Sequence, residues 1–179
     1  TIGKLKTEVM SERVKLINPE CTVNIIDDFI SPENQSDYLN RGYDYVIDAI
    51  DNVKTKASLI AYCKRNKINV ITIGGAGGQT DPTQIQIADL SKTIQDPLLA
   101  KVRSVLRKDY NFSQNPKRKF SIDAIFSTQP LIFPQMTEDC SISATMNCAN
   151  GFGAATMITA TFGFFAVSRV IDKLLKKKS

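Results

Sequence analysis

The 179-residue sequence contains no histidine. This absence excludes the usual general base of enzymes, the serine-hydrolase triad and the commonest metal ligand. Any catalysis must therefore use carboxylates, Lys, Arg, Cys or the backbone. With 42% apolar and 23% charged residues, the composition is that of a globular chain with enough apolar residues for a core, and excludes a disordered or fibrous protein.

The four cysteines lack the spacing of a zinc site or of a small disulfide scaffold, which favours reduced thiols in the cytoplasm. Three of them, Cys21, Cys63 and Cys140, have no special setting and are interpreted as structural. Cys148 lies just before the glycine-rich start of the last expected helix, where the positive end of the helix dipole would favour a thiolate. It is therefore a candidate nucleophile, and simple burial is the alternative.

No secretory signal pattern opens the chain, because residues 1–13 alternate charged and apolar side chains. The longest uncharged run, residues 151–167, is 17 residues long and rich in Gly, Ala and Thr. It predicts a buried helix, with membrane association as the alternative. Together with the reduced thiols, these features lead us to expect a cytoplasmic protein.

Positive charge is concentrated in the second half of the chain. Residues 1–100 hold 11 Lys and Arg against 13 Asp and Glu, whereas residues 101–179 hold 12 against 5. This asymmetry indicates that the second half meets an anionic partner, a nucleic acid or a membrane surface. Solvated lysine clusters are the alternative.

Strand and helix patterns alternate along the chain. Apolar runs predict strands at residues 22–26, 45–50, 68–73, 84–88 and 122–126, and helical spacing predicts helices at residues 5–17, 54–67, 154–175 and after Asp96-Pro97. Ser31-Pro32-Glu33 has the pattern of a short helix start, and residues 111–119 and 140–150 are expected to be loops. The alternation predicts an α/β fold, a Rossmann-like, mostly parallel sheet flanked by helices, as a single domain over residues 1–179 with a long C-terminal helix.

Polar side chains follow the second apolar strand and precede a helix, at Asp48, Asp51 and Asn52. Ligands of open α/β sheets bind at this carboxyl edge, and two carboxylates could hold Mg²⁺ beside a phosphate. The alternative is that Asp51-Asn52 only caps the helix. The glycine-rich segment 74–78 follows the next strand without matching a dinucleotide fingerprint, and is interpreted as a structural turn. Lys6 is either a phosphate ligand or a surface group.

Taken together, the motifs resemble a known superfamily. Segments 3–9, 17–19, 48–52 and 73–78 resemble the adenylating superfamily that includes ThiF, MoeB and the ubiquitin-activating enzymes. Segments 62–67, 77–86, 92–98 and 151–157 resemble, within it, the tRNA threonylcarbamoyladenosine dehydratase family. The resemblance implies an ATP-dependent enzyme that activates the carboxylate of the modified adenosine and cyclises it with net loss of water.

The resemblance also implies roles for individual residues. Lys6, Asp48, Asp51 and Asn52 would bind the nucleotide, with Lys6 and Asp51 acting in catalysis and Asp51 supporting Mg²⁺. Cys148 corresponds to a family cysteine, and a monovalent cation is a further implied ligand. The residues expected to track tRNA phosphates are Lys101, Arg103, Arg107, Lys108, Lys117, Arg118 and Lys119.

Partners and extent follow from the same resemblance, which implies a homodimer and association with cysteine-desulfurase sulfur-relay proteins. The family's glycine-rich phosphate loop, ribose-binding acid and phosphate-directed arginine would all precede residue 1. The sequence is therefore predicted to be the C-terminal portion of a larger domain and to bind ATP poorly alone. The alternatives are adenylation of a ubiquitin-like sulfur carrier, with Cys148 as acceptor, and a non-catalytic tRNA-binding remnant.

Overall fold

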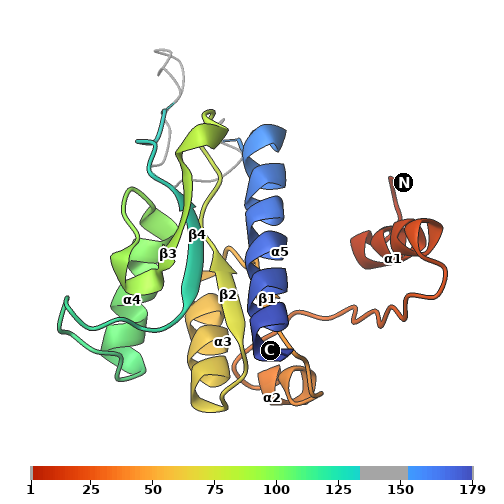
Figure 1. The fold of residues 1–179 in the computed structure, drawn as a ribbon, viewed down its shortest axis with the longest axis horizontal. Helices are drawn as coiled ribbons and strands as arrows, with labels where there is room; N and C mark the ends of the chain where they lie inside the picture. The colour runs from red at the N-terminus through yellow and green to blue at the C-terminus, as the bar shows by residue number, and fades with distance from the viewer. Residues whose placement is uncertain (1, 134–152, 179) are drawn as a thin grey trace. The chain divides into compact units, whose positions relative to one another are not determined.

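The computed structural model describes residues 2–133 and 153–178 of the chain. These residues group into two compact units, Thr1–Ile30 and Ser31–Ser179, which are described separately. The ribbon in Figure 1 labels the helices and strands of both units.

The first unit consists of helix α1 (Lys6–Ile17) and an irregular segment after it. An exposed ion pair joins Lys4 to Glu12 at 3.4 Å. The helix ends at Asn18, as predicted, and the backbone amide of Asn18 donates to the carbonyl of Val14. The predicted strand at residues 22–26 is wrong, because these residues are irregular. A β-rich run forms a strand only where a neighbouring strand completes its hydrogen bonds.

The second unit holds four helices and four strands among its described residues. The helices are α2 (Gln35–Leu39), α3 (Val53–Arg65), α4 (Pro97–Asp109) and α5 (Thr156–Lys178), and the strands are β1 (Val46–Asp48), β2 (Val70–Ile73), β3 (Ile85–Asp89) and β4 (Asp123–Ser127). Short 3-10 helices flank β3 at Pro82–Gln84 and Leu90–Lys92. All four of these strands and three of these helices were predicted to within a few residues. Helix α2 begins at Gln35, beyond the Ser31 start that the sequence predicts, because residues 32–34 form a turn.

The strands form one sheet in the order β1-β2-β4-β3. Strands β1, β2 and β4 are parallel, with Val46 opposite Val70 and Ile71 opposite Asp123. Strand β3 runs antiparallel to β4. The predicted α/β architecture with a mostly parallel sheet is thus confirmed, and the carboxyl ends of β1, β2 and β4 meet at one edge.

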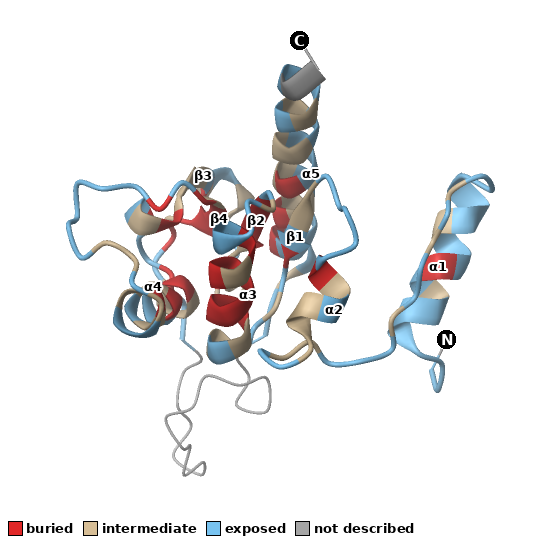
Figure 2. Ribbon diagram, turned by 90° about the horizontal axis from the view of Figure 1, so that it is seen from below, coloured by how far each residue is buried: buried red, intermediate tan, exposed pale blue. Residues whose placement is uncertain are grey.

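Helices cover both faces of the sheet. Figures 1 and 2 show α3 and α4 on one face and α5 on the other. Three α5 residues at four-residue spacing, Ile158, Phe162 and Ala166, are buried against Ile71, Ile85 and Ile125 of the strands. Since residues four apart share a helix face, one apolar stripe is enough to attach α5 to the sheet.

The opposite side of α5 is open to solvent, so the prediction of a buried helix holds for one face only. Phe164 is 74% exposed and Val167 is 49% exposed. Among the described residues, no helix is both long and apolar enough to cross a membrane. Membrane association through residues 151–167 stays a prediction.

Local capping signals explain where α3 and α4 begin. The Asn52 side chain accepts a hydrogen bond from the Thr55 amide at 3.1 Å. The Asp96 side chain accepts one from the Leu99 amide at 2.9 Å, and Pro97 occupies the first turn of α4. Each cap satisfies an amide that would otherwise lack a partner, and proline loses nothing in the first turn.

Candidate functional site

The candidate site lies at the carboxyl edge of the parallel strands. Asp48 ends β1, and Asp51 and Asn52 follow it before α3. Gly74 and Gly75 follow β2 at the same edge. Parallel topology therefore brings the polar segment 48–52 and the glycine segment together, as predicted for a ligand-binding edge.

A fully buried ion pair lies beneath this edge. The Lys56 ammonium is 3.0 Å from the Asp48 carboxylate, and neither side chain is exposed. The Thr72 hydroxyl donates a further hydrogen bond to Asp48 at 2.7 Å. Two buried charges are tolerated only when they are paired and further hydrogen-bonded, and this pair meets both conditions.

The same ion pair holds the backbone next to Asp51. The Lys56 ammonium donates to the Ile50 carbonyl at 3.0 Å, and the Ile50 amide donates to the Asp48 carboxylate at 3.0 Å. The backbone amide and carbonyl of Ile50 are thus both held by buried side chains. These contacts fix the backbone next to the exposed residue Asp51. Lys56 and Asp48 are therefore positioning residues for the segment that carries Asp51.

A second buried carboxylate, Asp96, joins the glycine segment to α4. It accepts a hydrogen bond from the Gly75 amide at 3.0 Å in addition to the Leu99 cap. A Cβ on Gly74 would overlap the Asp96 carboxylate, so this position requires glycine for space. Burial raises the pKa of Asp96, although hydrogen bonds from Leu99 and Gly75 and the charge of Lys56 act against the rise. The close approach of Gly74 to Asp96 agrees with the interpretation of this segment as a structural turn.

The predicted site residues have different environments. Asp51 is exposed at the edge, Asn52 beside it is committed to capping α3, and Asp48 is committed to Lys56. Lys6 is the exposed first residue of α1, in the first unit. Cys148 lies outside the described residues.

A magnesium ion would find one available carboxylate here. Asp51 is the acidic side chain of the segment that is not already paired or capping. Among the described residues, no three His, Cys, Asp or Glu side chains are grouped for a metal. Mg²⁺ commonly binds through one or two carboxylates together with substrate phosphates and water, so Asp51 fits an ion delivered with a nucleotide and not a preformed protein cage.

The basic residues predicted to meet tRNA divide into two groups. Lys101, Lys108, Lys117, Arg118 and Lys119 are exposed. In contrast, Arg103 donates to the Thr93 hydroxyl, and Arg107 donates to the Ser113 carbonyl at 3.3 Å with its guanidinium over the Phe120 ring at 5.3 Å. The two arginines therefore serve at least partly to attach α4 and the following loop to the domain.

Sequence reasoning missed Lys56 and Asp96 as members of this site. The signal for Lys56 was present, because Lys56, Leu59, Ile60 and Cys63 occupy one helical stripe and all are buried. A lysine in an apolar stripe indicates either a surface lysine at the margin or a buried partner of a carboxylate. Asp96 was recognised only as part of a helix start, since the close approach of Gly74 is visible only in three dimensions.

The fold and this edge are those of an α/β domain with a candidate ligand site at the carboxyl ends of parallel strands. The model of the ThiF family matches residues 1–179. The chain therefore belongs to the ThiF family, and the superfamily predicted from the sequence motifs is confirmed.

The chain is similar in sequence to curated tRNA-modifying enzymes. The chain is 98% identical over 179 residues to the tRNA threonylcarbamoyladenosine dehydratase of Haemophilus influenzae, covering 100% of this chain and 69% of that protein. It is 55% identical over 183 residues to the Escherichia coli enzyme of the same name, covering 98% of this chain and 68% of that protein.

The structural comparison agrees. A solved structure of the Escherichia coli tRNA N6-threonylcarbamoyladenosine dehydratase in complex with ATP superimposes with a TM-score of 0.87 at 53% identity, covering 98% of this chain and 66% of that one. A second structure of that enzyme, in complex with AMP, also gives a TM-score of 0.87. The chain thus spans about two thirds of the length of the relatives it matches.

Proposed function

We propose that this chain forms part of an enzyme that uses ATP to dehydrate and cyclise threonylcarbamoyladenosine in tRNA. The observation that carries the proposal is the 98% identity, over the whole chain, to the Haemophilus influenzae dehydratase. The ATP and AMP complexes of the Escherichia coli relative support nucleotide chemistry at the corresponding fold. They are also consistent with an acyl-adenylate intermediate. When such an intermediate reacts, AMP is the part of ATP that leaves.

The chemistry explains why ATP is needed. A carboxylate is a poor electrophile because its oxygen is a poor leaving group. Attack of a carboxylate oxygen on the α-phosphorus of ATP forms a mixed anhydride and releases pyrophosphate. Attack of the neighbouring carbamoyl group on the activated carbonyl, with loss of its N–H proton to solvent, then closes the ring and releases AMP. The oxygen lost from the carboxylate leaves in AMP, so that ATP hydrolysis balances the net loss of water.

Residues of this chain would support the first step by stabilising charge on the phosphates. Asp51 would hold a magnesium ion that arrives with the nucleotide, and Lys6 would neutralise a phosphate directly. The buried pair of Asp48 and Lys56 would keep Asp51 in place through Ile50. A monovalent cation is a further proposed ligand, for which no residue is assigned.

The RNA partner is proposed to bind through exposed lysines and arginine of α4 and the loop after it, at Lys101, Lys108 and residues 117–119. Such side chains contact phosphates with little sequence information. Recognition of the modified nucleotide is then left to the site itself. Formation of a homodimer, association with cysteine-desulfurase sulfur-relay proteins and a cytoplasmic location stay predictions that follow from the resemblance.

The proposal is tested by ATP-pyrophosphate exchange in a protein extended to the full length of the Haemophilus relative, with tRNA carrying threonylcarbamoyladenosine. Asp51→Ala is expected to reduce exchange by about a hundredfold or more, the scale of losing one electrostatic stabiliser, with an unchanged circular dichroism spectrum. Asp44→Ala is the matched control, because Asp44 is also an exposed aspartate, just before β1 at the other edge. Full exchange in Asp51→Ala would reject the role of Asp51.

The alternative activity, adenylation of a small carrier protein, is tested in parallel. The comparison is motivated by a 62-residue stretch, 35% of this chain, that is 37% identical to a Gracilaria tenuistipitata protein named as a probable molybdopterin-synthase adenylyltransferase. Exchange stimulated by a carrier protein with a C-terminal glycine, and not by modified tRNA, would overturn the proposed substrate. RNA binding without any exchange would indicate a non-catalytic RNA-binding protein.

A further inference from the structure

The second unit contains a large pocket at the edge of the sheet opposite the candidate site. Its volume is about 960 Å³. Val70 and Asp123 begin strands β2 and β4 there, and Tyr45 directly precedes β1. The pocket therefore lies at the amino ends of the parallel strands, whereas Asp51 lies at their carboxyl ends. It is a separate feature from the site described above.

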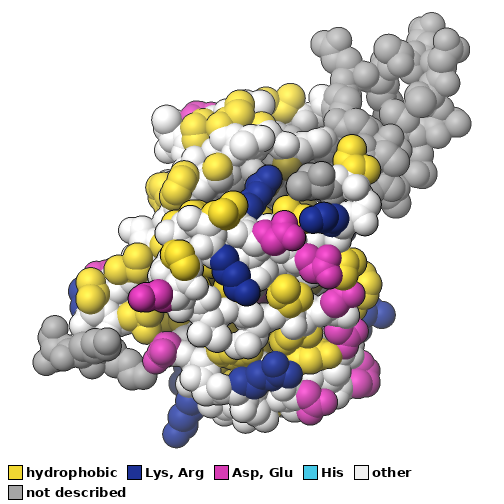
Figure 3. Space-filling view, turned by 90° about the vertical axis from the view of Figure 1, so that its right-hand side faces the viewer, with side chains coloured by type: hydrophobic (Ala, Val, Ile, Leu, Met, Phe, Trp, Pro, Cys, Tyr) yellow, Lys and Arg dark blue, Asp and Glu magenta, His cyan; other side chains and the backbone are white. Residues whose placement is uncertain are grey.

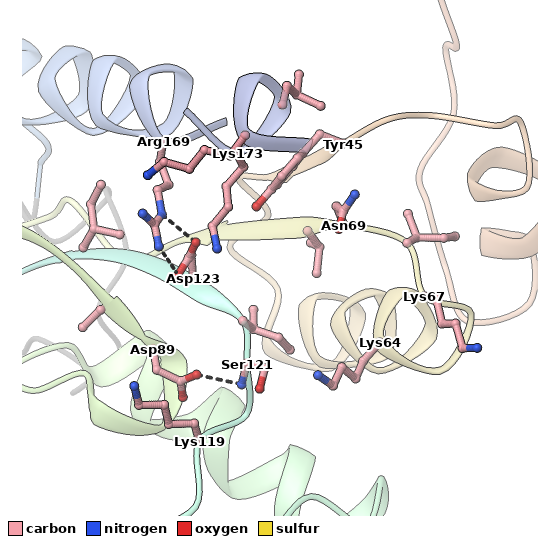
Figure 4. Close-up of a pocket in the computed structure, with 17 residues that line it drawn as sticks. Tyr45, Lys64, Lys67, Asn69, Asp89, Lys119, Ser121, Asp123, Arg169 and Lys173 are labelled. Atoms are coloured by element: carbon pink, nitrogen blue, oxygen red, sulfur yellow. Dashed lines mark hydrogen bonds and ion pairs between the residues drawn. The ribbon is translucent and has the colours of Figure 1, made fainter. Parts of the chain in front are cut away.

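The charge of this pocket is strongly positive. Six basic and two acidic side chains line it, a net charge of +4. The basic residues are Lys64, Lys67, Lys119, Arg169, Lys173 and Lys176. They come from α3, the turn after it, the loop before β4 and α5, so that segments far apart in the sequence bring cations to one place (Figure 4). Figure 3 shows that both basic and acidic side chains are present on the surface of the described residues.

The acidic groups of the pocket are already committed. Asp123 accepts two hydrogen bonds from the Arg169 guanidinium, at 2.7 and 3.2 Å. Asp89 accepts from the backbone amides of Phe120 and Ser121, at 2.9 and 2.7 Å. These contacts fix the walls. Asp89 keeps its negative charge, because backbone amides do not neutralise it, but neither carboxylate forms an ion pair with a lysine among the described residues.

Several lysines are thus available to a ligand. Among the described residues, Lys176 pairs with Asp172 at 2.9 Å, whereas no ion pair is formed by Lys64, Lys119 or Lys173. Figure 4 shows Lys173 pointing down from α5 into the pocket, with Lys64 and Lys119 along its lower side. These exposed lysines line the same cavity, so one anion could contact several point charges at once.

The remaining lining indicates which part of a nucleic acid the pocket fits. Tyr45 is the aromatic residue of the lining, and it is half-buried beside Asp123 and Arg169, where burial and then the charge of Asp123 raise its pKa. A half-buried phenol can donate one hydrogen bond, and a single ring of this kind offers little surface for stacking bases. Lysines recognise phosphates as point charges without reading sequence.

We propose that this pocket docks backbone phosphates of the tRNA substrate, at a distance from the nucleotide that reacts. The inference rests on the proposed function, since it takes the RNA to be the substrate. Lys119 belongs both to the pocket and to the exposed basic loop of residues 117–119, so the pocket continues the surface already proposed to meet RNA. An RNA that contacts both edges of the sheet is held in one orientation, with its modified nucleotide presented at the carboxyl edge.

The test measures tRNA affinity against salt concentration for the full-length protein and for the variant Lys64→Gln/Lys173→Gln. Both side chains are exposed, so the variant is expected to keep its melting temperature. Removing two phosphate contacts is expected to weaken binding roughly tenfold at low salt and to reduce the slope of log affinity against log salt by about 1 to 2. The matched control is Arg13→Gln/Lys15→Gln, which removes two exposed charges from α1 and is expected to change both quantities less.

Unchanged affinity and salt slope in Lys64→Gln/Lys173→Gln, with normal binding by the unmodified protein, would overturn the pocket and leave the proposed function intact. Failure of the unmodified protein to bind tRNA or to catalyse exchange would instead overturn the proposed function. Inorganic tripolyphosphate is the small-anion probe. If it binds in the pocket by calorimetry and the double variant abolishes that binding without affecting tRNA, the pocket serves a small phosphate compound and the RNA proposal is wrong.

Discussion

The Lys56 ammonium and the Asp48 carboxylate lie 3.0 Å apart, and both side chains are completely buried. The pair joins α3 to the end of β1, and both of its members hydrogen-bond the backbone of Ile50. The charges that the fold protects from water thus lie directly beneath the segment carrying Asp51. This relationship makes the stability of the unit and the geometry of the edge depend on the same two residues.

Removing one member of this pair is expected to be severe. Lys56→Met leaves Asp48 buried without its counter-charge and is expected to reduce the free energy of unfolding by about 3–5 kcal/mol. The double variant Asp48→Asn/Lys56→Met should recover part of this loss, because no unpaired charge remains. Urea denaturation provides the measurement, and Lys54→Met, an exposed lysine of the same helix, is the control. Additive losses in the double variant would contradict the coupling.

Two neighbouring glycines are expected to respond differently to the same substitution. In Gly74→Ala the new Cβ overlaps the Asp96 carboxylate, which cannot move without breaking its hydrogen bonds to Gly75 and Leu99. We expect a loss of about 1–3 kcal/mol in thermal or chemical unfolding. In Gly75→Ala the nearest atoms, in Leu98 and Asp96, lie at 3.7 and 3.9 Å, an ordinary contact. Equal effects at the two positions would be evidence against the close approach at Gly74.

Stability should depend on pH through Asp96 in an unusual direction. Because burial raises its pKa in the folded chain above the ordinary value of 3.8, the folded state binds the proton more tightly than the unfolded state. The contribution of Asp96 is therefore fully present below the unfolded pKa and is lost as pH rises through the folded pKa. The stability difference between the unsubstituted chain and Asp96→Asn is expected to shrink as pH rises above 3.8.

Asp89 provides the opposite case and serves as the comparison. Burial raises its pKa, but hydrogen bonds from Ser91, Phe120 and Ser121 outweigh that effect, so the pKa is lowered from 3.8 overall. Its contribution is present above the unfolded pKa and is lost as pH falls through the folded pKa. The stability difference for Asp89→Asn should therefore grow as pH rises toward 3.8, below the range in which the difference for Asp96→Asn shrinks. Parallel trends would mean that at least one of the two environments is wrong.

Cys63 is expected to resist alkylation in the folded chain. Its side chain is completely buried, and burial, followed by the charge of Asp48, raises its pKa to about 11. Since the thiolate is the reactive form, both access and ionisation oppose reaction at pH 8. Peptide mapping after brief iodoacetamide treatment should show modification of the partly exposed Cys21 before Cys63. Labelling of Cys63 at the rate found in urea would contradict its burial.

Local sequence signals determined most of the helices and strands and the residues at the carboxyl edge. Asp96-Pro97 and Asn52 cap helices through contacts a few residues away, which is why the starts of α3 and α4 were predictable. The same holds for the position of Asp51 after β1, because an apolar run followed by a helix start fixes the end of a parallel strand. The pattern at residues 22–26 predicted a strand as clearly as the other apolar runs, but no strand forms there. A strand depends on a partner strand that the local sequence does not specify.

Tertiary structure alone decided which charged residues are buried and which gather together. Lys56 lies in the apolar stripe of α3 and Lys54 does not, but the stripe alone does not show that Lys56 is fully buried against Asp48 while Lys54 is exposed. Only the packing of α3 on the sheet sets how far each side of the helix is covered. Likewise, Lys64, Lys119 and Lys173 are scattered along the sequence and line one pocket. The sequence determines the elements through neighbouring residues, and the fold determines their shared sites through distances between residues that are far apart in the chain.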